Sequence, residues 1–317
     1  MKKKILITHP LSPSRIDELN GIHQVDCIKD INTKYEEVLS LVQDYDALHC
    51  LGLKADKQIM DRGTKLQLIS NYGVGYDNIN IAYATSKGIA VANTPISTSK
   101  ATAEYTLGLI LSLLRKITIN DKKLRLGLLT NWSTSVQSGN SLYGKTLGIF
   151  GMGRIGKEVA LMARAFGMEV IYYSRTKLPA TEEEKYKATY VSENQLMSTA
   201  DIVTIHAPLT TETHHIIDTT LLNLMKPSSW IVNTARGGLI DHDALVSILE
   251  EGKIKGAALD VFPEEPKIPS KLLTMDHVIL SPHNGTGTFE DRAAMFDESF
   301  NNILAYFEGE KMSGRVC

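Results

Sequence analysis

The stretch from residue 144 to residue 175 constrains the fold more than any other part of this 317-residue chain. It reads GKTLGIFGMGRIGKEVALMARAFGMEVIYYSR, with a G-x-G-x-x-G turn formed by Gly151, Gly153 and Gly156 between an apolar run and a helical pattern. A second apolar run follows the helical pattern. Strand, glycine turn, helix and strand in this order predict a βαβ unit that binds a dinucleotide, with the phosphates at the N-terminus of the helix.

Each glycine of this turn has its own expected role. Gly151 permits the tight turn, Gly153 lets the backbone approach a pyrophosphate, and Gly156 lets helix and strand pack closely. The alternative is a tight turn in an α/β protein whose crevice binds nothing. Because the turn sits inside a complete βαβ unit, dinucleotide binding is favoured.

The end of the second strand bears on the choice of dinucleotide. A site selective for NAD holds the ribose 2′-hydroxyl with an Asp or Glu at this point, whereas this chain has Ser174, followed by Arg175, Thr176 and Lys177. The missing carboxylate and the basic residues favour a 2′-phosphate, so we expect NADP(H) to be preferred and NAD(H) to remain usable. The alternative is that Arg175 and Lys177 belong to a solvated loop.

The rest of the chain repeats the alternation of strand-like and helical patterns, which indicates parallel sheets covered by helices. Its length favours two domains over one. The strand-like runs form two groups, separated by residues 90–98, a long helical stretch from Ala101 to about Gly127 and a polar loop through Asn140. The runs are KILIT, DALHCL, LQLISNYGV, LGIFGMG, EVIYYS, DIVTIHA, WIVNTA, GAALDV and HVILSP.

A last helix is predicted after residue 288, and it cannot extend the second sheet as a strand. We expect it to cross back to the first domain, which makes that domain discontinuous. The predicted division is residues 1–98 plus 287–317 for a substrate-binding domain and 99–286 for a dinucleotide-binding domain of Rossmann type. One face of the helix carries Phe296, Phe300, Ile303, Leu304 and Phe307.

Composition narrows the class of protein. The net charge is −2, from 34 basic and 36 acidic residues, which gives no sign of a nucleic-acid partner. The most apolar segment, residues 106–114, is too short to cross a bilayer and is expected to be a buried helix. Three widely spaced cysteines without metal-ligand spacing indicate a reducing compartment, so a cytoplasmic location and no metal are expected.

Charged residues follow three successive predicted strands of the second group. Arg236 follows WIVNTA, Asp260, Glu264 and Glu265 follow GAALDV, and His283 follows HVILSP. Reduction of a 2-keto acid needs a proton donor, for which histidine is suited, a carboxylate that orients the imidazole, and a guanidinium that holds the substrate carboxylate. His283, Glu265 and Arg236 fit these roles, although each residue taken alone is more simply a structural or surface group.

At this point the chain resembles the D-isomer-specific 2-hydroxyacid dehydrogenases over nearly its whole length. The resemblance implies that Arg236, Glu265 and His283 are catalytic, that two Rossmann-like or flavodoxin-like domains enclose an active site in the cleft between them, and that the chain forms a homodimer through its helix from Ala101 and an arm through Trp132. The motifs that carry it are NYGVGYDNIN, GIAVANTP, GKTLGIFGMGRIG, HAPLTTETHHII, NTARGGLIDHDAL, GAALDVFPEEP and VILSPHNG.

The resemblance also implies further contacts. The loop at Val74 and Gly75 would bind the substrate carboxylate through backbone amides, and Asp260 would lie near the nicotinamide carboxamide. In place of the aliphatic residue that many members have after the histidine, this chain has Asn284. The expected cofactor-binding residues are Gly151, Met152, Gly153, Arg154, Ile155, Gly156, Ser174, Arg175, Thr176, Pro208, Thr213, Thr234, Ala235 and Asp260.

Within the family, NYGVGYDNIN, YYSRT and PLTTETHHII are most similar to the glyoxylate/hydroxypyruvate reductase branch. The expected function is therefore reduction of a small 2-keto acid to the D-2-hydroxy acid. Two alternatives stay open: a different 2-keto acid, such as 2-ketogluconate, pyruvate or a bulkier one, and a dinucleotide-sensing binding protein like the corepressors that share this fold. A pocket's discrimination by one methylene is worth only ~1–3 kcal/mol, too little to be read from residue identities.

Overall fold

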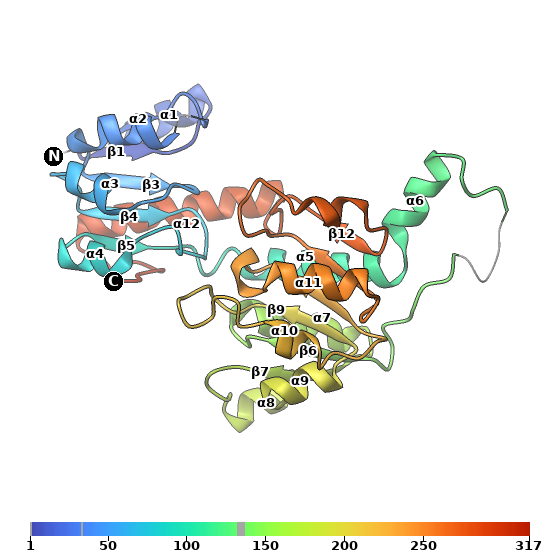
Figure 1. Cartoon of the computed structure of the whole chain (residues 1–317). Coiled ribbons are helices and arrows are strands. Elements are labelled where there is room, and N and C mark those ends of the chain that lie inside the picture. The colour runs from blue at the N-terminus through green and yellow to red at the C-terminus, as the bar shows by residue number, and fades with distance from the viewer. Residues whose placement is uncertain (1, 33, 132–136) are drawn as a thin grey trace. The chain divides into compact units, whose positions relative to one another are not determined.

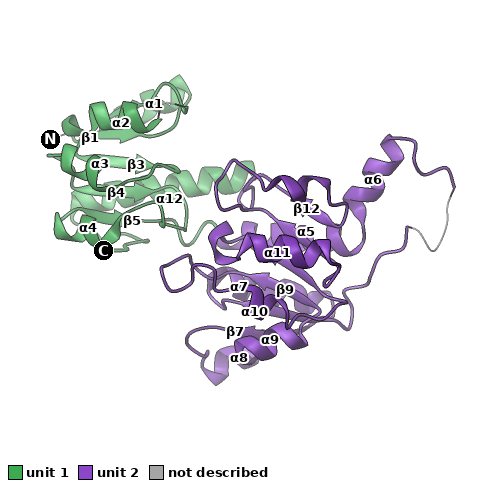
Figure 2. Cartoon of the chain, viewed as in Figure 1, with its two compact units in different colours: residues 1–98, 288–317 green, residues 99–287 purple. Residues whose placement is uncertain are grey.

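In the computed structural model, which describes residues 2–32, 34–131 and 137–317, the chain forms two compact units. Residues 1–98 and 288–317 belong to the first unit and residues 99–287 to the second (Figures 1 and 2). Each unit contains a parallel sheet with helices on both of its faces. The predicted fold class, two α/β domains with parallel sheets, is confirmed.

The first unit has a five-stranded sheet in the order β2-β1-β3-β4-β5, which is the flavodoxin-like order. Side chains of a strand point alternately to its two faces, so Ile5 and Ile7 pack on one side of the sheet and Leu6 on the other. The strands are β1 (Lys4–Ile7), β2 (Gln24–Cys27), β3 (Ala47–Cys50), β4 (Leu68–Asn71) and β5 (Ala90–Ala92), and the helices are α1 (Pro13–Asn20), α2 (Lys34–Leu41), α3 (Lys57–Arg62), α4 (Ile81–Ser86) and α12 (Phe289–Glu308).

Helix α12 packs against β3 and β4 of the first sheet. Phe296, Phe300 and Ile303, three of the residues predicted for its apolar face, are buried there. The Glu298 carboxylate also accepts hydrogen bonds from the amides of Ile96 and Ser97, at 3.2 and 2.9 Å. The last helix is therefore part of the core of the first unit.

The second unit has a seven-stranded sheet in the order β12-β11-β10-β9-β6-β7-β8, an extended form of the Rossmann order. Helices α5 and α7 cover one face, and α9, α10 and α11 cover the other. The strands are β6 (Thr146–Phe150), β7 (Glu169–Tyr173), β8 (Ala188–Tyr190), β9 (Ile202–Ile205), β10 (Trp230–Asn233), β11 (Gly256–Leu259) and β12 (Val278–Leu280), and the helices are α5 (Ser99–Leu114), α6 (Ile117–Arg125), α7 (Arg154–Ala165), α8 (Ala180–Tyr186), α9 (Glu193–Thr199), α10 (Thr219–Leu222) and α11 (His242–Glu250).

All nine apolar runs of the sequence form strands, but β2, β5 and β8 did not stand out as strands in the sequence. These three strands lie at the edges of their sheets. Strand β2 contains the polar residues Gln24 and Asp26, and β5 and β8 are only three residues long, so none of the three shows a long apolar run. The sequence pattern at these three strands was therefore too weak to predict them.

The stretch from Ala101 to about Gly127, expected to be helical, is helical over most of its length. The stretch is two helices, α5 and α6, separated by Lys116, whose φ of 57° is left-handed. Helix α6 extends outward from the body of its unit (Figure 1). The expected arm through Trp132 falls partly on residues 132–136, outside the described residues.

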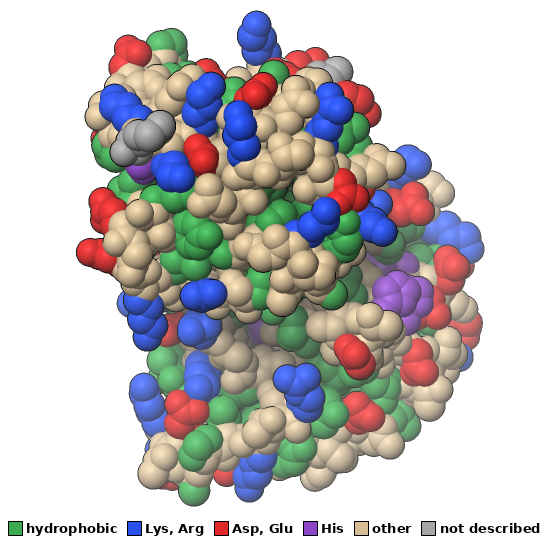
Figure 3. Space-filling view, turned by 90° about the vertical axis from the view of Figure 1, so that its left-hand side faces the viewer, with side chains coloured by type: hydrophobic (Ala, Val, Ile, Leu, Met, Phe, Trp, Pro, Cys, Tyr) green, Lys and Arg blue, Asp and Glu red, His purple; other side chains and the backbone are tan. Residues whose placement is uncertain are grey.

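The surface carries both signs of charge. On the face of the molecule drawn in Figure 3, basic and acidic side chains are interspersed. Among the described residues, no helix is both long and apolar enough to cross a membrane.

Two histidines are buried among aromatic rings in the first unit. The His9 ring stacks on Tyr72 with 5.5 Å between ring centroids, and His49 Nε2 lies 2.6 Å from the Ser299 hydroxyl. Burial, helped by the positive charge of Lys34, lowers the pKa of His9 to about 4. The folded first unit therefore resists protonation of His9.

Replacing His9 by Phe should make the protein less sensitive to acid. Because the pKa of His9 in the folded protein lies below the ordinary value of 6.5, the unfolded chain binds more protons than the folded one between pH 6.5 and 4. The free energy of unfolding therefore decreases as the pH is lowered through this window, by up to about 3 kcal/mol for His9. Urea denaturation at pH 7 and 4.5 should show a smaller loss for His9→Phe than for the parent. The exposed His277, changed to Gln, is the control, and an equal loss in all three proteins would contradict the prediction.

Candidate active site

The order of the strands in the second sheet defines a crevice. Strand β6 lies between β9 and β7, so the chain winds in opposite directions on its two sides. Ligands of open α/β sheets bind outside the carboxyl ends of the strands at such a point. The glycine turn follows β6 there, and His206 follows β9, with its amide donating to the carbonyl of Phe150 at 2.8 Å.

The backbone explains two of the three glycines of the turn. Gly151 has a φ of 104°, and a Cβ on it would lie 2.6 Å from the nitrogen of Ala207. A Cβ on Gly156 would lie 2.4 Å from the carbonyl oxygen of Gly151, so helix α7 can pack this closely on the turn only with glycine there. Both contacts agree with the roles expected for a dinucleotide turn.

The N-terminus of α7 is open to a ligand. Gly153 is the N-cap, and among the described residues no side chain caps the helix and no atom lies within 4 Å of a Cβ built on Gly153. Arg154 is exposed and Ile155 is half-buried, whereas Met152 packs in the core. Free amides, the helix dipole and open space above Gly153 fit a phosphate group.

At the end of β7, Ser174 faces the glycine turn. The amide of Met152 donates to its hydroxyl oxygen at 2.6 Å, so Ser174 holds the turn and keeps its own proton for another acceptor. Arg175 and Thr176 are exposed. Lys177 lies 3.4 Å from the Glu183 carboxylate, so it contributes less positive potential than its sequence position suggested.

A second loop at this edge is held by its own threonine. Thr213 donates from its hydroxyl to the carbonyl of Pro208 at 2.7 Å, and the amide of Thr210 donates to Thr213 at 2.8 Å. Glu212, on the same loop, has a pKa lowered first by the hydroxyl of Thr210 and also by the charge of Arg175. The charges of Arg175 and Glu212 therefore interact at this side of the crevice.

His283 and Glu265 form a hydrogen-bonded pair. His283 Nδ1 lies 2.8 Å from Glu265 Oε2, and the amide of Phe262 donates to Glu265 Oε1 at 3.0 Å. Burial raises the pKa of Glu265, but the hydrogen bond and charge of His283, the Phe262 amide and the charge of Arg236 together lower it below its ordinary value. The carboxylate thus stays ionised beside the imidazole and orients it.

Arg236 follows β10 in a turn that its neighbours fix. The side chain of Asn233 donates to the Arg236 carbonyl at 2.8 Å and accepts from the amide of Ala235 at 3.0 Å. A Cβ on Gly237 would lie 2.1 Å from the carbonyl carbon of Phe262, so glycine allows this turn to approach the segment that leads to Glu265. Thr234, next to this turn, is buried with its hydroxyl 2.9 Å from that of Thr106.

Asp260 holds the histidine loop from below. It is fully buried, and its carboxylate accepts from the Ser281 hydroxyl at 2.5 Å and from the amides of Asn284 and Gly285, each at 2.9 Å. The amide of His283 donates to the Asp260 carbonyl at 2.8 Å. These bonds surround a histidine with a left-handed φ of 51°, a conformation that persists only where the surroundings fix it.

The first unit contributes a separate loop, Gly73 to Gly75. Asn71 donates to the carbonyls of Gly73 and Gly75 at 3.1 and 2.7 Å, and Asn93 donates to that of Val74 at 2.7 Å. Among the described residues, no hydrogen bond uses the amides of Val74 or Gly75 as donors. With its carbonyls held and its amides unpaired, the loop is suited to bind a carboxylate.

Sequence reasoning missed several groups that shape these sites. Gly237 and Gly238 directly follow Arg236, and a pair of glycines is a sequence signal from which a close approach of the backbone could have been predicted. The amide of Asn93 and the hydroxyl of Ser281 act on residues distant in sequence, and nothing in their local sequence marks them. Asn71 acts within its own loop, on Gly73 and Gly75. His206, buried beside the glycine turn with a pKa lowered by burial to about 3, also escaped notice.

Known proteins resemble this chain over most of its length. Residues 107–285 match the D-isomer specific 2-hydroxyacid dehydrogenase family in its NAD binding domain. A glyoxylate reductase of Thermococcus litoralis is 40% identical over 98% of this chain and 95% of its own, and a D-3-phosphoglycerate dehydrogenase of Methanocaldococcus jannaschii is 43% identical over 97% of this chain and 58% of its own. The solved structure of an NADPH-dependent glyoxylate/hydroxypyruvate reductase of Sinorhizobium meliloti, in complex with NADP and malonate, aligns with a TM-score of 0.89 at 29% identity, covering 100% of this chain and 97% of that one.

Changing Asp260 to Asn should loosen the histidine loop. The amide group of Asn removes one acceptor oxygen and leaves a buried backbone amide without its partner, which costs about 1–3 kcal/mol of stability. Thermal denaturation should show a lower Tm for Asp260→Asn than for the parent. The exposed Asp276, changed to Asn in the same way, should leave Tm unchanged; equal Tm values for all three proteins would show that Asp260 does not hold the loop.

Proposed function

This chain belongs to the D-isomer-specific 2-hydroxyacid dehydrogenase family, and on that premise we propose that it reduces a small 2-keto acid to the D-2-hydroxy acid with a nicotinamide dinucleotide. Membership of this family makes the protein an oxidoreductase. The specific reaction, the roles of individual residues and the preferred dinucleotide are the proposal.

The hydrogen bond between His283 and Glu265 carries this proposal. It joins an imidazole to an ionised carboxylate, close enough to Arg236 for the guanidinium to lower the pKa of that carboxylate. A proton donor, the group that orients it and a cation for an acidic substrate are the parts that keto-acid reduction needs. All three come from the second unit, at the ends of β10, β11 and β12.

In the proposed reaction, each residue has one task. Glu265 holds Nδ1 of His283, which leaves Nε2 to give its proton to the carbonyl oxygen of the substrate, and Glu265 stabilises the imidazolium before transfer. Arg236 binds the substrate carboxylate and polarises its carbonyl. The nicotinamide, when bound, supplies the hydride that C2 receives. In the reverse direction His283 accepts the proton instead.

The amides of Val74 and Gly75 are proposed to bind the substrate carboxylate as well. This assigns the predicted domain of residues 1–98 with 287–317 to the substrate and that of residues 99–286 to the dinucleotide. Glyoxylate and hydroxypyruvate are the proposed substrates, in line with the names of the Thermococcus and Sinorhizobium proteins. Because the Methanocaldococcus relative is a D-3-phosphoglycerate dehydrogenase, a different 2-keto acid is the alternative substrate.

The dinucleotide is proposed to bind along the crevice at β6 and β9. The amides from Gly153 to Ile155 would hold its pyrophosphate at the N-terminus of α7, where open space and free donors fit that group. Pro208, Thr213, Thr234 and Ala235 would line the rest of the site, and Asp260 would serve it by holding the loop that follows β12.

We also propose that two copies of the chain form a homodimer. Helix α6 presents Ile117, Leu124 and, directly after it, Leu126 and Leu128, all exposed by 46% or more. Exposed apolar side chains gathered on a protruding segment are typical of a protein interface. The resemblance of residues 101–132 to the pairing segment of the family supports the same interface.

The proton-transfer proposal predicts a sharp loss of turnover without His283. His283→Ala should lower kcat by about 10²–10⁴-fold while the Kd of the dinucleotide stays within about twofold of the parent value. Steady-state reduction of glyoxylate, with binding followed by nicotinamide fluorescence, measures both. Parental turnover in His283→Ala would refute the assignment.

Glu265→Gln provides a matched variant of the same pair. Glutamine fills the same space without a negative charge, so His283 loses the ionised acceptor that orients it, and kcat for keto-acid reduction should fall about tenfold or more. A kcat equal to that of the parent would contradict the role proposed for Glu265.

The cofactor proposal predicts a preference for NADPH. Without a carboxylate at Ser174, Arg175 can pair with the 2′-phosphate, and such a charge-assisted bond is worth about 1.5–3 kcal/mol, or roughly a ten- to hundredfold ratio of kcat/KM. The double variant Ser174→Asp, Arg175→Ala should reverse the ratio toward NADH. Glu212→Gln is a useful companion, because removing this competing carboxylate should strengthen the preference for NADPH. A parent that prefers NADH would show that Arg175 serves only as a solvated loop residue.

A further inference from the structure

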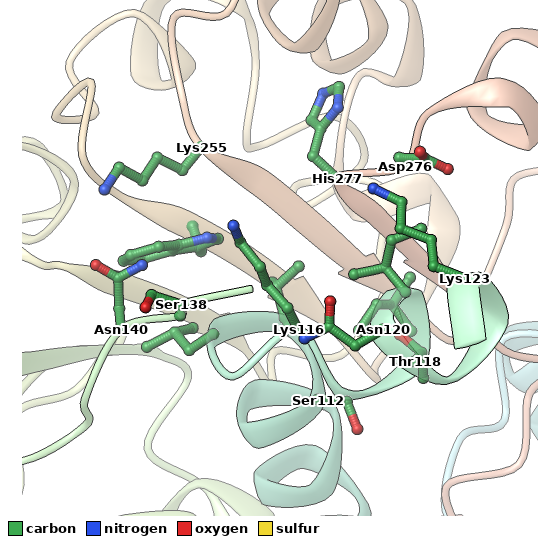
Figure 4. Close-up of a pocket in the computed structure, with 16 residues that line it drawn as sticks. Ser112, Lys116, Thr118, Asn120, Lys123, Ser138, Asn140, Lys255, Asp276 and His277 are labelled. Carbon is green, nitrogen blue, oxygen red and sulfur yellow. The ribbon is translucent and has the colours of Figure 1, made fainter. Parts of the chain in front are cut away.

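The pocket drawn in Figure 4 does not offer a free site in the proposed assembly. It is lined by residues of α6, such as Thr118, Asn120 and Lys123, and by residues 138–140. Helix α6 belongs to the segment through which two copies of the chain are proposed to pair, so a partner subunit would cover this pocket. The first unit, in contrast, contains a buried polar network that the proposed reaction does not use.

Asn302 is a buried asparagine in the interior of helix α12. It is 1% exposed, and the same helix buries Phe296, Phe300 and Ile303. Asparagine is an unfavourable residue inside a helix, and burial deprives its side-chain amide of water. Such a residue is tolerated where both ends of the amide find partners within the protein.

Both ends of the Asn302 side chain have such partners. Its Oδ1 accepts from the amides of Ser313 and Gly314, at 2.9 and 3.4 Å, and from the Ser313 hydroxyl at 3.1 Å. Its Nδ2 donates to the carbonyl of Asn93 at 3.0 Å. A backbone amide only donates and a carbonyl only accepts, so these partners fix which way the side-chain amide points. Asn302 therefore ties the segment after α12 to the residue that follows β5.

Asn93 is held on two sides by these contacts. Its carbonyl accepts from Asn302, and its own amide donates to the carbonyl of Gly314 at 2.9 Å. A Cβ on Gly314 would lie 2.0 Å from the Asn93 carbonyl oxygen, so only glycine lets this segment pass so closely. With its backbone held in this way, Asn93 donates from its side chain to the Val74 carbonyl at 2.7 Å.

The bonds to the Gly73–Gly75 loop control where its amides point. The carbonyl of Gly73 shares a planar peptide group with the amide of Val74, and the carbonyl of Val74 shares one with the amide of Gly75. The amide of Thr94 donates to the Gly73 carbonyl at 3.1 Å, and Asn93 donates to that of Val74. Each bond to a carbonyl thus sets the direction of the amide in the same peptide group.

We propose that Asn302 is a positioning residue for the substrate carboxylate and acts through Asn93. It holds Asn93, which in turn directs the Gly75 amide toward the carboxylate. Gly314 shares this task because it holds the amide of the same asparagine. The inference rests on the proposed function, in which the amides of Val74 and Gly75 bind the keto acid.

Asn302→Asp separates the two ends of the side chain. At pH 8 the carboxylate still accepts from Ser313 and Gly314 but cannot donate to Asn93, so the loop loses part of its support. In steady-state reduction of glyoxylate and hydroxypyruvate, KM should rise about five- to tenfold while kcat stays within about twofold of the parent value. The reason is that the loop holds the carboxylate equally in the ground state and in the transition state.

A second variant and a matched control accompany this change. Gly314→Ala places a methyl group against the Asn93 carbonyl, so it should raise KM in the same way. Ser70→Ala removes the buried hydrogen bond of 2.6 Å from the Ser70 hydroxyl to the Ser299 carbonyl of α12. It weakens the packing of the same helix without touching Asn93, so it should lower Tm but leave KM unchanged.

Hydrogen exchange of the loop gives a readout that needs no substrate. Mass spectrometry of a peptide that spans Gly73 to Gly75 should show faster exchange in Asn302→Asp and Gly314→Ala than in the parent and Ser70→Ala. A parent that reduces neither keto acid would contradict the proposed function, and the exchange would then decide by itself whether Asn302 positions the loop.

Three results would overturn the inference. The first is loop exchange at the parental rate in both Asn302→Asp and Gly314→Ala. The second is a KM equal to that of the parent in both variants although their loops exchange faster. The third is an equal rise of KM in Ser70→Ala, which would mean a general loosening of the first unit.

Discussion

Parallel pairing of the seven strands in the second unit is the constraint on which the proposed chemistry depends. It brings the carboxyl ends of β6, β9, β10, β11 and β12 to the same end of the sheet. The glycine turn, the Arg236 turn and the loops of Glu265 and His283 therefore lie at that end, although more than 130 residues of sequence separate the first from the last. Backbone hydrogen bonds within the sheet fix this register. Side chains that follow the strands need only short, rigid turns to reach a ligand.

The turns are made rigid by groups that have no part in the proposed reaction. Asp260 uses both carboxylate oxygens to hold the loop after β12, and Asn233 holds the turn after β10 from both sides. His283 keeps a left-handed backbone within this frame. Ordering these loops in advance removes an entropic cost that substrate binding would otherwise bear, which is how positioned groups accelerate a reaction.

Much of this arrangement could be predicted from the sequence, because it rests on local patterns. Nine apolar runs marked nine of the strands, and the spacing of Gly151, Gly153 and Gly156 marked the βαβ unit. Strands β5 and β8 escaped because each is only three residues long, and β2 because polar residues interrupt it. The left-handed backbone of Lys116 divides the helical stretch into α5 and α6, and the helical pattern of the sequence continues on both sides of it.

In the candidate site, too, some features could be predicted from the sequence and others could not. Arg236, Glu265 and His283 were predicted because each follows a recognisable strand, and the structure brings His283 and Glu265 within hydrogen-bond distance. The part that Ser174 plays toward the Met152 amide, and the pairing of Lys177 with Glu183, depend on tertiary contacts and could not be read from the sequence.

The central claim is that His283, oriented by Glu265, gives its proton to the carbonyl oxygen of a 2-keto acid whose carboxylate Arg236 holds. A crystal structure of the protein with NADP and oxamate, an unreactive keto-acid analogue, tests this claim most directly. It should place His283 Nε2 within about 3.2 Å of the carbonyl oxygen of oxamate and the Arg236 guanidinium on its carboxylate. An oxamate bound with its carbonyl oxygen turned away from His283, or held without Arg236, would contradict the account.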